Sequence, residues 1–264
     1  MKYKMIATDF DSTLLSSDKK VSENNKNILL DLKERGYYIV GVTARNLSSV
    51  NSVCDINMFN YLIFSNGNYI YDVDKDKGES INSVSLDTIR KLFDKYKDNS
   101  NGMSFCSLDK YYIYTDNVGS FRDFEIPIDN VDDIEEDIHK VNIFVSLEDI
   151  DKCRDYIKNN CRDVDSIIMQ DTDIDNSKWV TIASYNVNKY TALKRLCNKL
   201  NISVSEVIFF GDSGNDLEII SGVGMGVAME NALPEIKKVA KEITLSNDED
   251  GVYVFLNKIF NRRR

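Results

Sequence analysis

The sequence is poor in the residues that mark several classes of protein. Its 264 residues include two prolines, one histidine and five cysteines. The cysteines show no metal-ligand spacing, and their odd number does not suit a disulfide framework, so we expect reduced thiols and a cytoplasmic location. The single histidine, His139, lies in a charged segment with helical patterning, and we expect it at the surface. No Gly/Ser-rich tract marks a flexible linker between domains.

Long apolar runs and clusters of basic residues are also missing. No stretch approaches the roughly 18 uninterrupted apolar residues that a membrane span needs. Asp9 and Asp11 interrupt the first apolar run, so we expect no signal peptide. The net charge of −10 and a pI near 4.8 favour a soluble protein and disfavour a nucleic-acid partner. We interpret the basic run at 262–264 as a solvated terminus and favour a monomer with no membrane partner.

Short apolar runs alternate with helical patterns in the first eighty residues. The runs Met5–Thr8, Tyr37–Val42 and Leu62–Phe64 are typical of buried parallel strands. Ser22 is placed to cap the helix between the first two. A series of this kind predicts a parallel sheet with right-handed crossovers. The same rhythm resumes after residue 184, where Val207–Phe210 is a further strand.

The intervening residues have a different pattern. After a helix that Ser85 can cap, apolar alternation and charged segments predict a mixture of strands and helices. The expected strands are Met103–Ser107, Tyr111–Thr115, Val141–Ser146, Ser166–Gln170 and Lys178–Ala183, and the expected further helices are Val131–Lys140 and Leu147–Asn159. We therefore predict an α/β fold: a Rossmann-like parallel-sheet core of residues 1–82 and 184–264, with an α+β cap inserted at 83–183.

Polar residues directly follow three of the predicted core strands. These stretches are Asp9–Thr13, Thr43–Arg45 and Gly211–Asp216. In an open α/β sheet, ligands bind in the crevice beyond the carboxyl ends of the strands. We therefore expect the three stretches to meet in space and to form one site.

The paired carboxylates in the first stretch indicate phosphoryl transfer. Residues two apart on an extended chain point the same way, so Asp9 and Asp11 can both face a ligand while Phe10 turns into the core. A carboxylate can attack phosphorus and form an aspartyl-phosphate. A second carboxyl can protonate the leaving group and later activate water. We assign Asp9 as the nucleophile and Asp11 as the general acid and base.

A site with this many acidic groups needs a cation. Unaided, the cluster would raise its own pKa values and repel an anionic substrate. Oxygen ligands and few carboxylates suit Mg²⁺ better than Ca²⁺ or zinc. The predicted metal site comprises Asp9, Asp11, Asp212 and Asp216. Lys189, the Thr43 hydroxyl and backbone N–H groups near Phe10, Asp11 and Ala44 would hold the phosphate.

Each stretch also has a simpler interpretation. An Asp-x-Asp pair often marks a solvated turn, Thr43 could merely cap a helix, and a lysine such as Lys189 at the start of a helix is usually exposed. An EF-hand beginning at Asp9 is excluded because Leu14 stands where glycine belongs. We interpret the acidic run 171–175 as a solvated hairpin loop, with substrate contact as the alternative. The combination of stretches favours the catalytic interpretation.

Taken together, the stretches resemble the motifs of the haloacid dehalogenase-like hydrolase superfamily. Asp9 to Leu15 resembles the first motif, Thr43 to Arg45 the second, Lys189 the third and Gly211 to Asp216 the fourth. Ser65 to Gly67 is similar to a feature of the Cof-type, sugar-phosphatase-like subgroup, which has a large α+β cap. The resemblance extends over essentially the whole chain.

The resemblance implies roles for individual residues. It implies that the Asp9 carboxylate, the Asp11 backbone carbonyl and Asp212 hold Mg²⁺, and that Asp216 supports the metal site. It implies phosphate contacts from Thr43 and Lys189. We expect further contacts with phosphate or substrate from Phe10, Ala44, Arg45 and Asn215.

Two residues depart from the subgroup pattern. Ser12 and Ala44 stand where glycine is usual, at points where the backbone approaches phosphate. Glycine is favoured at close approaches and at unusual dihedral angles. Because both replacements are small and every charged position remains, we expect altered rate or geometry at most.

These observations predict a Mg²⁺-dependent phosphatase for small phosphorylated metabolites, with sugar phosphates as the leading class. One alternative is a phosphosugar mutase that uses the same chemistry. Another is a non-catalytic sensor of a phosphorylated metabolite, which the retention of both Asp9 and Asp11 disfavours. We expect residues 83–183 to discriminate between substrates.

Overall fold

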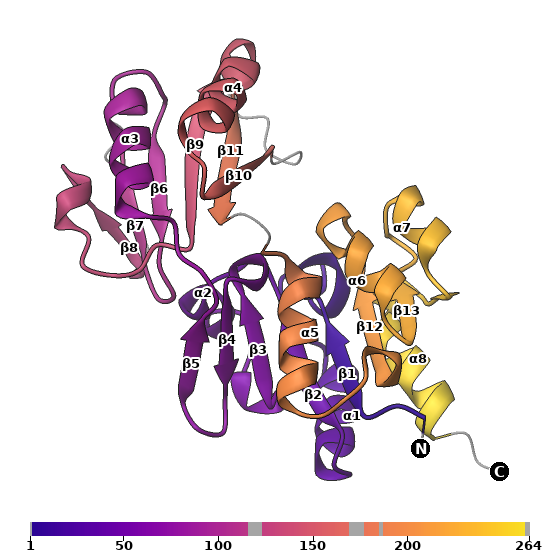
Figure 1. Cartoon of the computed structure of the whole chain (residues 1–264). Coiled ribbons are helices and arrows are strands. Elements are labelled where there is room, and N and C mark those ends of the chain that lie inside the picture. The colour runs from indigo at the N-terminus through magenta and orange to yellow at the C-terminus, as the bar shows by residue number, and fades with distance from the viewer. Residues whose placement is uncertain (1, 116–122, 169–176, 185–186, 262–264) are drawn as a thin grey trace. The chain divides into compact units, whose positions relative to one another are not determined.

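The structure is a computed structural model that describes residues 2–115, 123–168, 177–184 and 187–261 (Figure 1). The chain forms two compact units. Unit 1 comprises Met1–Arg45, Val50–Ile81 and Asn188–Arg264, and unit 2 comprises Asn46–Ser49 and Asn82–Val187. The acidic run 171–175 and the basic run 262–264 lie outside the described residues.

Unit 1 is built on an eight-stranded sheet. Its strands are Met5–Thr8 (β1), Tyr38–Val42 (β2), Tyr61–Phe64 (β3), Tyr69–Asp72 (β4), Lys77–Ser80 (β5), Val207–Gly211 (β12), Met225–Ala228 (β13) and Glu242–Ile243 (β14). The order across the sheet is β14-β13-β12-β1-β2-β3-β4-β5, and all neighbours from β14 to β3 are parallel. The predicted α/β class and its parallel core are confirmed.

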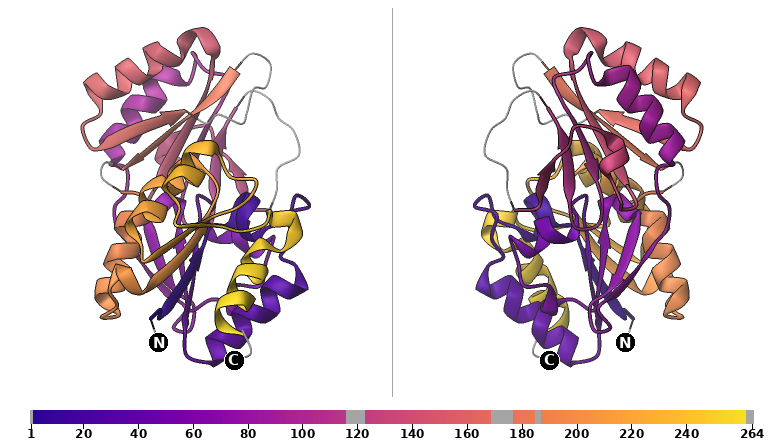
Figure 2. Two further views of the ribbon diagram at one scale, coloured as in Figure 1. Left: turned by 90° about the vertical axis from the view of Figure 1, so that its right-hand side faces the viewer. Right: turned by 90° about the vertical axis from the view of Figure 1, so that its left-hand side faces the viewer.

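Helices cover both faces of this sheet. They are Glu23–Glu34 (α1), Leu47–Asn51 (α2, which straddles the two units), Lys189–Lys199 (α5), Leu217–Gly222 (α6), Pro234–Val239 (α7) and Gly251–Phe260 (α8). The short helical turns are Phe10–Leu14 (η1), Ile56–Met58 (η2), Ser65–Gly67 (η3), Val204–Glu206 (η6), Gly214–Asp216 (η7) and Asn247–Glu249 (η8). Helices α5 and α6 lie on one face, and α1 and α8 pack together on the other (Figure 2). The strands are therefore buried on both sides, as their apolar runs predict.

The local sequence explains where α1 begins. The Ser22 hydroxyl accepts a hydrogen bond from the Asn25 backbone N–H at 3.1 Å, which makes Ser22 the N-cap, as predicted. Ile28, Leu29 and Leu32 occur at helical spacing and are buried. The apolar face of this helix closes one side of the sheet.

The hairpin of β4 and β5 was not predicted from the sequence. β4 pairs with β3 in the antiparallel direction and β5 pairs with β4, so the hairpin extends the sheet beyond its parallel part. Its turn contains Asp76 at φ 50°, a left-handed conformation that aspartate adopts more readily than most residues. A turn without glycine, asparagine or proline at its tip gives a weak sequence signal.

Unit 2 is built on a six-stranded sheet. Its strands are Met103–Cys106 (β6), Tyr111–Tyr114 (β7), Glu125–Pro127 (β8), Lys140–Ser146 (β9), Val164–Ile168 (β10) and Ser177–Ser184 (β11), in the order β10-β11-β9-β6-β7-β8. Its helices are Leu86–Tyr96 (α3) and Ile150–Asn160 (α4), with short turns at Val131–Asp133 (η4) and Leu147–Asp149 (η5). Both helices pack on the same face of the sheet, and the main hydrophobic core of the unit lies between them and the strands (Figure 2).

The segment before β9 differs from the prediction. The expected helix Val131–Lys140 is wrong: only Val131–Asp133 forms a helical turn, and the chain then runs irregularly into β9. Two acidic residues of this segment pair with separate basic partners, Asp132 with Arg90 and Glu136 with Lys110. Repulsion among closely spaced acidic groups would also weaken a helix here.

His139 is not at the surface, and that expectation is wrong. Its side chain is buried, and Nδ1 lies 3.2 Å from the carbonyl oxygen of Asn82. Burial lowers the pKa of the imidazole. The neighbouring Ile138 belongs to the hydrophobic core, so the chain is held against the sheet at this point.

In the described part of the chain, none of the helices has both the length and the apolar character needed to cross a membrane. The five cysteines are free thiols.

Candidate active site

Three of the predicted site segments begin at the carboxyl ends of adjacent strands. Asp9 directly follows β1, Thr43 follows β2 and Asp212 follows β12. β1 is the central strand of the three and pairs in parallel with both neighbours. The Asp9 backbone N–H donates to the carbonyl oxygen of Phe210 at 2.9 Å, which continues the ladder by one residue. The three side chains therefore start from one edge of the sheet.

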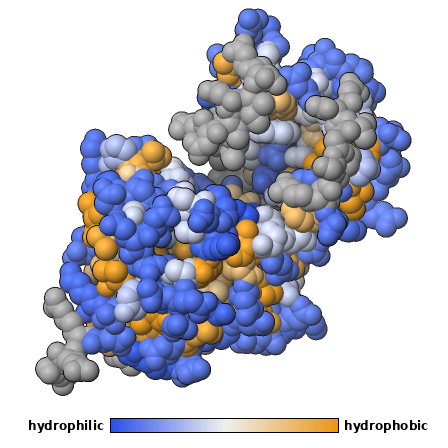
Figure 3. Space-filling view, turned by 180° about the vertical axis from the view of Figure 1, so that it is seen from behind, coloured by the Kyte–Doolittle hydropathy of each residue, from blue (hydrophilic) through white to orange (hydrophobic). Residues whose placement is uncertain are grey.

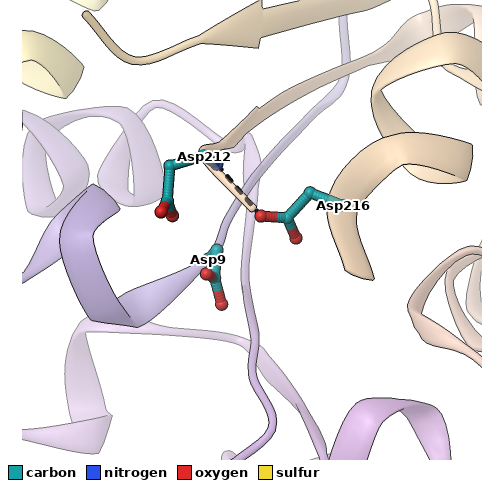
Figure 4. A group of neighbouring side chains, drawn as sticks. All are labelled: Asp9, Asp212 and Asp216. Atoms are coloured by element: carbon teal, nitrogen blue, oxygen red, sulfur yellow. Dashed lines mark hydrogen bonds between the residues drawn. The ribbon is translucent and has the colours of Figure 1, made fainter. Parts of the chain in front are cut away.

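Three carboxylates gather at this edge. One oxygen from each of Asp9, Asp212 and Asp216 lies within 4.8 Å of the others (Figure 4). Asp216 Oδ2 accepts hydrogen bonds from the backbone N–H groups of Asp212 at 3.0 Å and Ser213 at 3.2 Å. The loop after β12 is thus folded around the Asp216 carboxylate, which fixes where Asp212 projects.

Gly211 makes room for this arrangement. A Cβ atom at Gly211 would lie 2.7 Å from Cγ and Oδ2 of Asp216, closer than real contacts allow. Asp216 is itself completely buried. Glycine at the end of β12 is therefore required by the close approach of the carboxylate.

Lys189 joins the cluster from the first position of α5. Its Nζ donates to Asp9 Oδ1 at 2.8 Å and to Asp216 Oδ1 at 2.7 Å, and its side chain is 1% exposed. Asn188 caps the helix by accepting the Thr191 backbone N–H at 2.8 Å. The turn at Gly67, with φ 109°, packs so closely that a Cβ there would lie 2.3 Å from the Asn188 carbonyl oxygen. The interpretation of Lys189 as a surface residue is excluded.

Burial dominates the electrostatics of the cluster. It raises the pKa of Asp9 to about 8, although the neighbouring Lys189 ammonium acts in the opposite direction. Burial likewise raises the pKa of Asp212 to about 6, against the effect of a 2.7 Å hydrogen bond from the Thr13 hydroxyl. Burial also opposes the charge of Lys189, but Asp216 and Asp9 outweigh it and raise the pKa of the ammonium. One lysine does not neutralise three carboxylates.

The donor set fits a hard divalent cation. All three acidic groups offer oxygen, and at the cluster no sulfur or imidazole joins them among the described residues. Both oxygens of Asp216 already accept hydrogen bonds, whereas in the described part of the chain Oδ2 of Asp9 and Oδ2 of Asp212 accept none. Asp9 and Asp212 are therefore the residues best able to hold an ion directly. Asp216 instead orients Lys189 and the loop after β12.

Comparison with known proteins agrees with this geometry. The sequence profile of the haloacid dehalogenase-like hydrolases matches residues 6–256. The chain belongs to this family. The match confirms the family that the motifs resemble and the expectation of an enzyme of the hydrolase class.

Several relatives are similar over nearly their full length. The 5-amino-6-(5-phospho-D-ribitylamino)uracil phosphatase YitU of Bacillus subtilis is 28% identical over 97% of both chains. A second B. subtilis phosphatase of the same description, YcsE, is 28% identical over 94% of this chain and 92% of its own. The crystal structure of a haloacid dehalogenase-like hydrolase from Bacteroides thetaiotaomicron has a TM-score of 0.84, at 23% identity, over 98% of this chain and 100% of that chain. The last comparison supports the fold.

In this hydrolase, Asp11 lies apart from the acidic cluster. Its two carboxylate oxygens accept hydrogen bonds from Arg45 Nε and Nη2, both at 2.7 Å, and from Lys19 Nζ at 2.9 Å. Burial would raise the pKa of Asp11, but the hydrogen bonds from Arg45 and Lys19 outweigh it and lower the pKa to about 2. The side chain is therefore held as a carboxylate. The guanidinium of Arg45, expected to contact substrate, is engaged with Asp11.

The remaining predicted residues line the same region in different ways. Phe10 is fully buried, with its ring centroid 5.5 Å from that of Phe59, so its side chain belongs to the core. Thr43 is buried, and its hydroxyl accepts the Arg45 backbone N–H at 3.0 Å, while Ala44 between them is half-buried. The contribution of Phe10 and Ala44 to a phosphate site would come from their backbones.

Asn215 connects two of the motif segments. Its Nδ2 donates to Asn66 Oδ1 at 2.9 Å, and its Oδ1 accepts from the Ser213 hydroxyl at 2.8 Å. Asn66 belongs to the turn at the end of β3 and has φ 56°. The hydrogen bond therefore ties the loop after β12 to the loop after β3.

Ser12 adopts a left-handed conformation, with φ 56° and ψ 13°. The side chain of Asn231 donates to the Ser12 carbonyl oxygen at 2.8 Å and accepts the Asn247 backbone N–H at 3.1 Å. The turn η1 is thus held by contacts from the C-terminal part of the chain. The expected preference for glycine at this position has a clear cause, because the left-handed region is unfavourable for other residues.

The sequence interpretation missed four residues that shape the site. Thr13 orients Asp212, Lys19 contacts Asp11, Asn66 binds Asn215 and Asn231 braces Ser12. Each is a side-chain contact across at least eight residues of sequence. Thr13 and Asn66 do lie within motif stretches, but the stretches alone do not reveal which partner each one contacts.

Proposed function

We propose that the protein is a Mg²⁺-dependent phosphatase of small phosphorylated metabolites. The observation that carries the proposal is the buried Asp9 carboxylate, which lies beside Lys189 and shares the edge of the sheet with Asp212. A nucleophile, a fixed cation and an oxygen-rich place for a divalent ion are the parts that phosphoryl transfer to a carboxylate requires. Mg²⁺, when bound, would supply positive charge beside the phosphate.

The proposed cycle begins with Asp9 ionised and Asp11 protonated. In the first step, an oxygen of the Asp9 carboxylate attacks phosphorus, the bond from phosphorus to the leaving oxygen breaks, and the leaving alkoxide takes the proton from Asp11. In the second step, Asp11 removes a proton from water, the water oxygen attacks phosphorus, and the bond between phosphorus and Asp9 breaks. Inorganic phosphate is released and both carboxyl groups return to their initial states. Lys189 would stabilise the charge on the transferred group.

The contacts of Asp11 bear directly on this cycle. Held by Arg45 and Lys19, Asp11 is ionised, which suits the step in which it acts as a base. The acid step needs a proton on the same group. Loss of the two contacts would move its pKa toward the ordinary value and favour protonation. We therefore propose that Asp11 leaves Arg45 and Lys19 during the acid step.

The proposed substrates are phosphate monoesters of sugars and sugar alcohols. Two B. subtilis relatives are named as phosphatases of a phosphorylated ribityl compound that carries a uracil ring. A compound of this class is accordingly the first candidate to test beside plain sugar phosphates. We also propose that unit 1 is the catalytic core and unit 2 the specificity cap of a Cof-type phosphatase; a cytoplasmic location and a monomeric state remain predictions.

The test is release of inorganic phosphate from p-nitrophenyl phosphate and from a panel of sugar phosphates. We expect turnover with Mg²⁺, loss of turnover with a chelator, and recovery when Mg²⁺ is restored. Absence of phosphate release from every ester would contradict the proposal and favour the sensor. A mutase would instead convert one sugar phosphate into an isomer without accumulating phosphate.

A further inference from the structure

One face of the unit 2 sheet carries no helix in the described residues. Along β9, Val141, Ile143 and Val145 are buried in the core beneath α3 and α4. Because side chains alternate along a strand, the half-buried Lys140, Asn142 and Phe144 point to the opposite side. We call this opposite side the open face. Seen from behind, the part of unit 2 that the described residues form carries both hydrophilic and hydrophobic residues (Figure 3).

A cavity of about 380 Å³ lies on the open face. Its size falls within the range typical of sites for small organic ligands. The lining residues with side chains on this face include Ser104, Tyr111, Lys140, Asn142, Phe144 and Trp179. The composition is mixed: aromatic rings, polar groups and a lysine line the cavity, and so does the acidic Glu125.

Two aromatic rings form one wall of the cavity. Phe144 and Trp179 are directly paired across β9 and β11, with ring centroids 4.8 Å apart and planes inclined by 31°. Both residues are half-buried. Adjacent aromatic side chains at a cavity offer flat surfaces on which another ring can stack. A planar ring can stack on them.

A row of hydrogen-bonded polar side chains runs to the cavity, which Asn142 and Ser104 line. The Thr181 hydroxyl donates to Asn142 Oδ1 at 2.9 Å, and Asn142 Nδ2 donates to the Ser104 hydroxyl at 2.9 Å. These bonds fix the orientation of the Asn142 amide, which is half-buried, between the buried Thr181 and Ser104 side chains. The cavity therefore has an ordered amide among its lining groups.

Lys140 adds a positive charge to the same cavity. It is the next residue of β9 on the open face, and its Nζ lies 5.7 Å from the ring centroid of Tyr111. Burial opposes the charge, but Tyr111 and Cys106 raise the pKa of the ammonium, so Lys140 stays protonated near neutral pH. An ammonium beside fixed polar groups favours carbonyl oxygens or anionic edges of a ligand.

We propose that the open face of unit 2 binds a planar heteroaromatic ring with carbonyl acceptors, the ring stacking on Trp179 and its acceptors facing Lys140. That this ring belongs to the leaving group of the substrate rests on the proposed phosphatase function. The binding of the ring itself does not. We then expect the highest kcat/KM for phosphate esters in which a sugar or sugar alcohol carries such a ring.

Trp179 provides a direct test because it is the only tryptophan of the chain. Uridine, which has a pyrimidine ring but no phosphate, is titrated against the full-length protein while tryptophan emission is followed. We expect a saturable change with uridine and none with ribitol. Lys140→Met should weaken the response at least tenfold. Lys178→Met, a lysine on the other side of the sheet in β11, should leave it unchanged.

Steady-state kinetics distinguish binding of the ring on unit 2 from hydrolysis of the phosphate ester. Uridine 5′-monophosphate and ribose 5-phosphate share the same phosphate ester and differ by the ring. We expect kcat/KM to favour the former, and Trp179→Ala to reduce that preference about tenfold through KM, with kcat for ribose 5-phosphate unchanged. If no ester is hydrolysed, the phosphatase proposal fails while the fluorescence titration still decides on the ring site.

Three outcomes would overturn the proposal. One is the absence of a saturable emission change with uridine, and another is an equal response to ribitol. The third is a second copy as the true occupant of the open face. Sedimentation would then show a concentration-dependent dimer that Trp179→Ala dissociates, with no effect of uridine on the wild-type protein.

Discussion

The two sheets of this protein carry their functional groups in different places. In unit 1 helices cover both faces of the sheet, and the polar groups lie where β1, β2 and β12 end. In unit 2 helices cover one face, and polar and aromatic groups lie on the other. A parallel sheet buried on both sides can present side chains to a ligand at its ends, whereas a mainly antiparallel sheet with helices on one side can do so from its other face. Side chains at the strand ends converge on one point, which suits a reaction. Side chains on a sheet face are spread out, which suits contact with a larger part of a ligand.

Replacement of Asp9 should have the largest effect, and it should affect hydrolysis but not the binding of a ring to unit 2. Asp9→Asn removes the proposed nucleophile, so hydrolysis of every ester should fall by at least about 10⁴-fold, comparable to the loss of other catalytic nucleophiles. The fluorescence response of Trp179 to uridine should persist, since it depends on residues of unit 2. Phosphate release and the emission titration measure the two effects. Asp18→Asn, at an exposed aspartate nearby, is the matched control and should retain activity.

Replacement of Lys189 tests how far the stability of unit 1 depends on a buried charge. Lys189→Met leaves Asp9 and Asp216 without their shared partner, and removing one partner of a buried ion pair typically costs about 3–5 kcal/mol. We expect the free energy of unfolding to fall by this amount at pH 8 and by less at pH 5, where Asp9 takes up a proton. Urea unfolding at the two pH values measures the loss.

Lys194→Met provides the control for that measurement because Lys194 is exposed on the same helix. A loss no larger than the control's would show that the buried ion pair contributes little to the stability of unit 1.

Magnesium and pH should act together on unit 1. The pKa of Asp9, about 8, and that of Asp212, about 6, lie above their ordinary value of 3.8, so the folded protein holds more protons than the unfolded chain over this range. Without metal, these two groups should make the free energy of unfolding decrease as the pH rises from about 4 to 8.

Mg²⁺ competes with those protons, so its stabilising effect should be larger at pH 8 than at pH 5. At a concentration 100 times its dissociation constant it would contribute about 2.7 kcal/mol. Thermal unfolding with and without Mg²⁺ at both pH values is the measurement, with Asp9→Asn as the control. Equal shifts at both pH values would argue against binding by these carboxylates.

The smallest expected effect concerns the backbone at Ser12. Ser12→Gly relieves the left-handed conformation at φ 56° but increases the entropy of the unfolded chain, so we expect stabilisation of at most about 1 kcal/mol. Ser80→Gly, in the exposed edge strand β5, should instead destabilise the protein, because glycine weakens a strand. Denaturant midpoints compare the two variants, and destabilisation by Ser12→Gly would contradict the prediction.

Much of unit 1 could be predicted from the sequence because its signals are local. The apolar runs of β1, β2 and β12 are continuous, the cap of α1 lies within three residues of its partner, and parallel strands must end at a common edge. Unit 2 was harder. The segment 131–140 combines helical spacing with acidic residues whose partners, such as Arg90 and Lys110, are distant in sequence. The burial of His139 depends on the strand that follows it.

The residues that we propose to react could therefore be identified in the sequence, since Asp9, Asp212 and Lys189 occur in recognisable stretches at strand ends and a helix start. Only the tertiary structure decided their protonation and partners. Burial raises the pKa of Asp9, whereas two basic side chains lower the pKa of Asp11, although only one residue separates the two in the chain. The reason is physical: burial and charge are properties of everything folded around a group, and residues far away in sequence supply most of both.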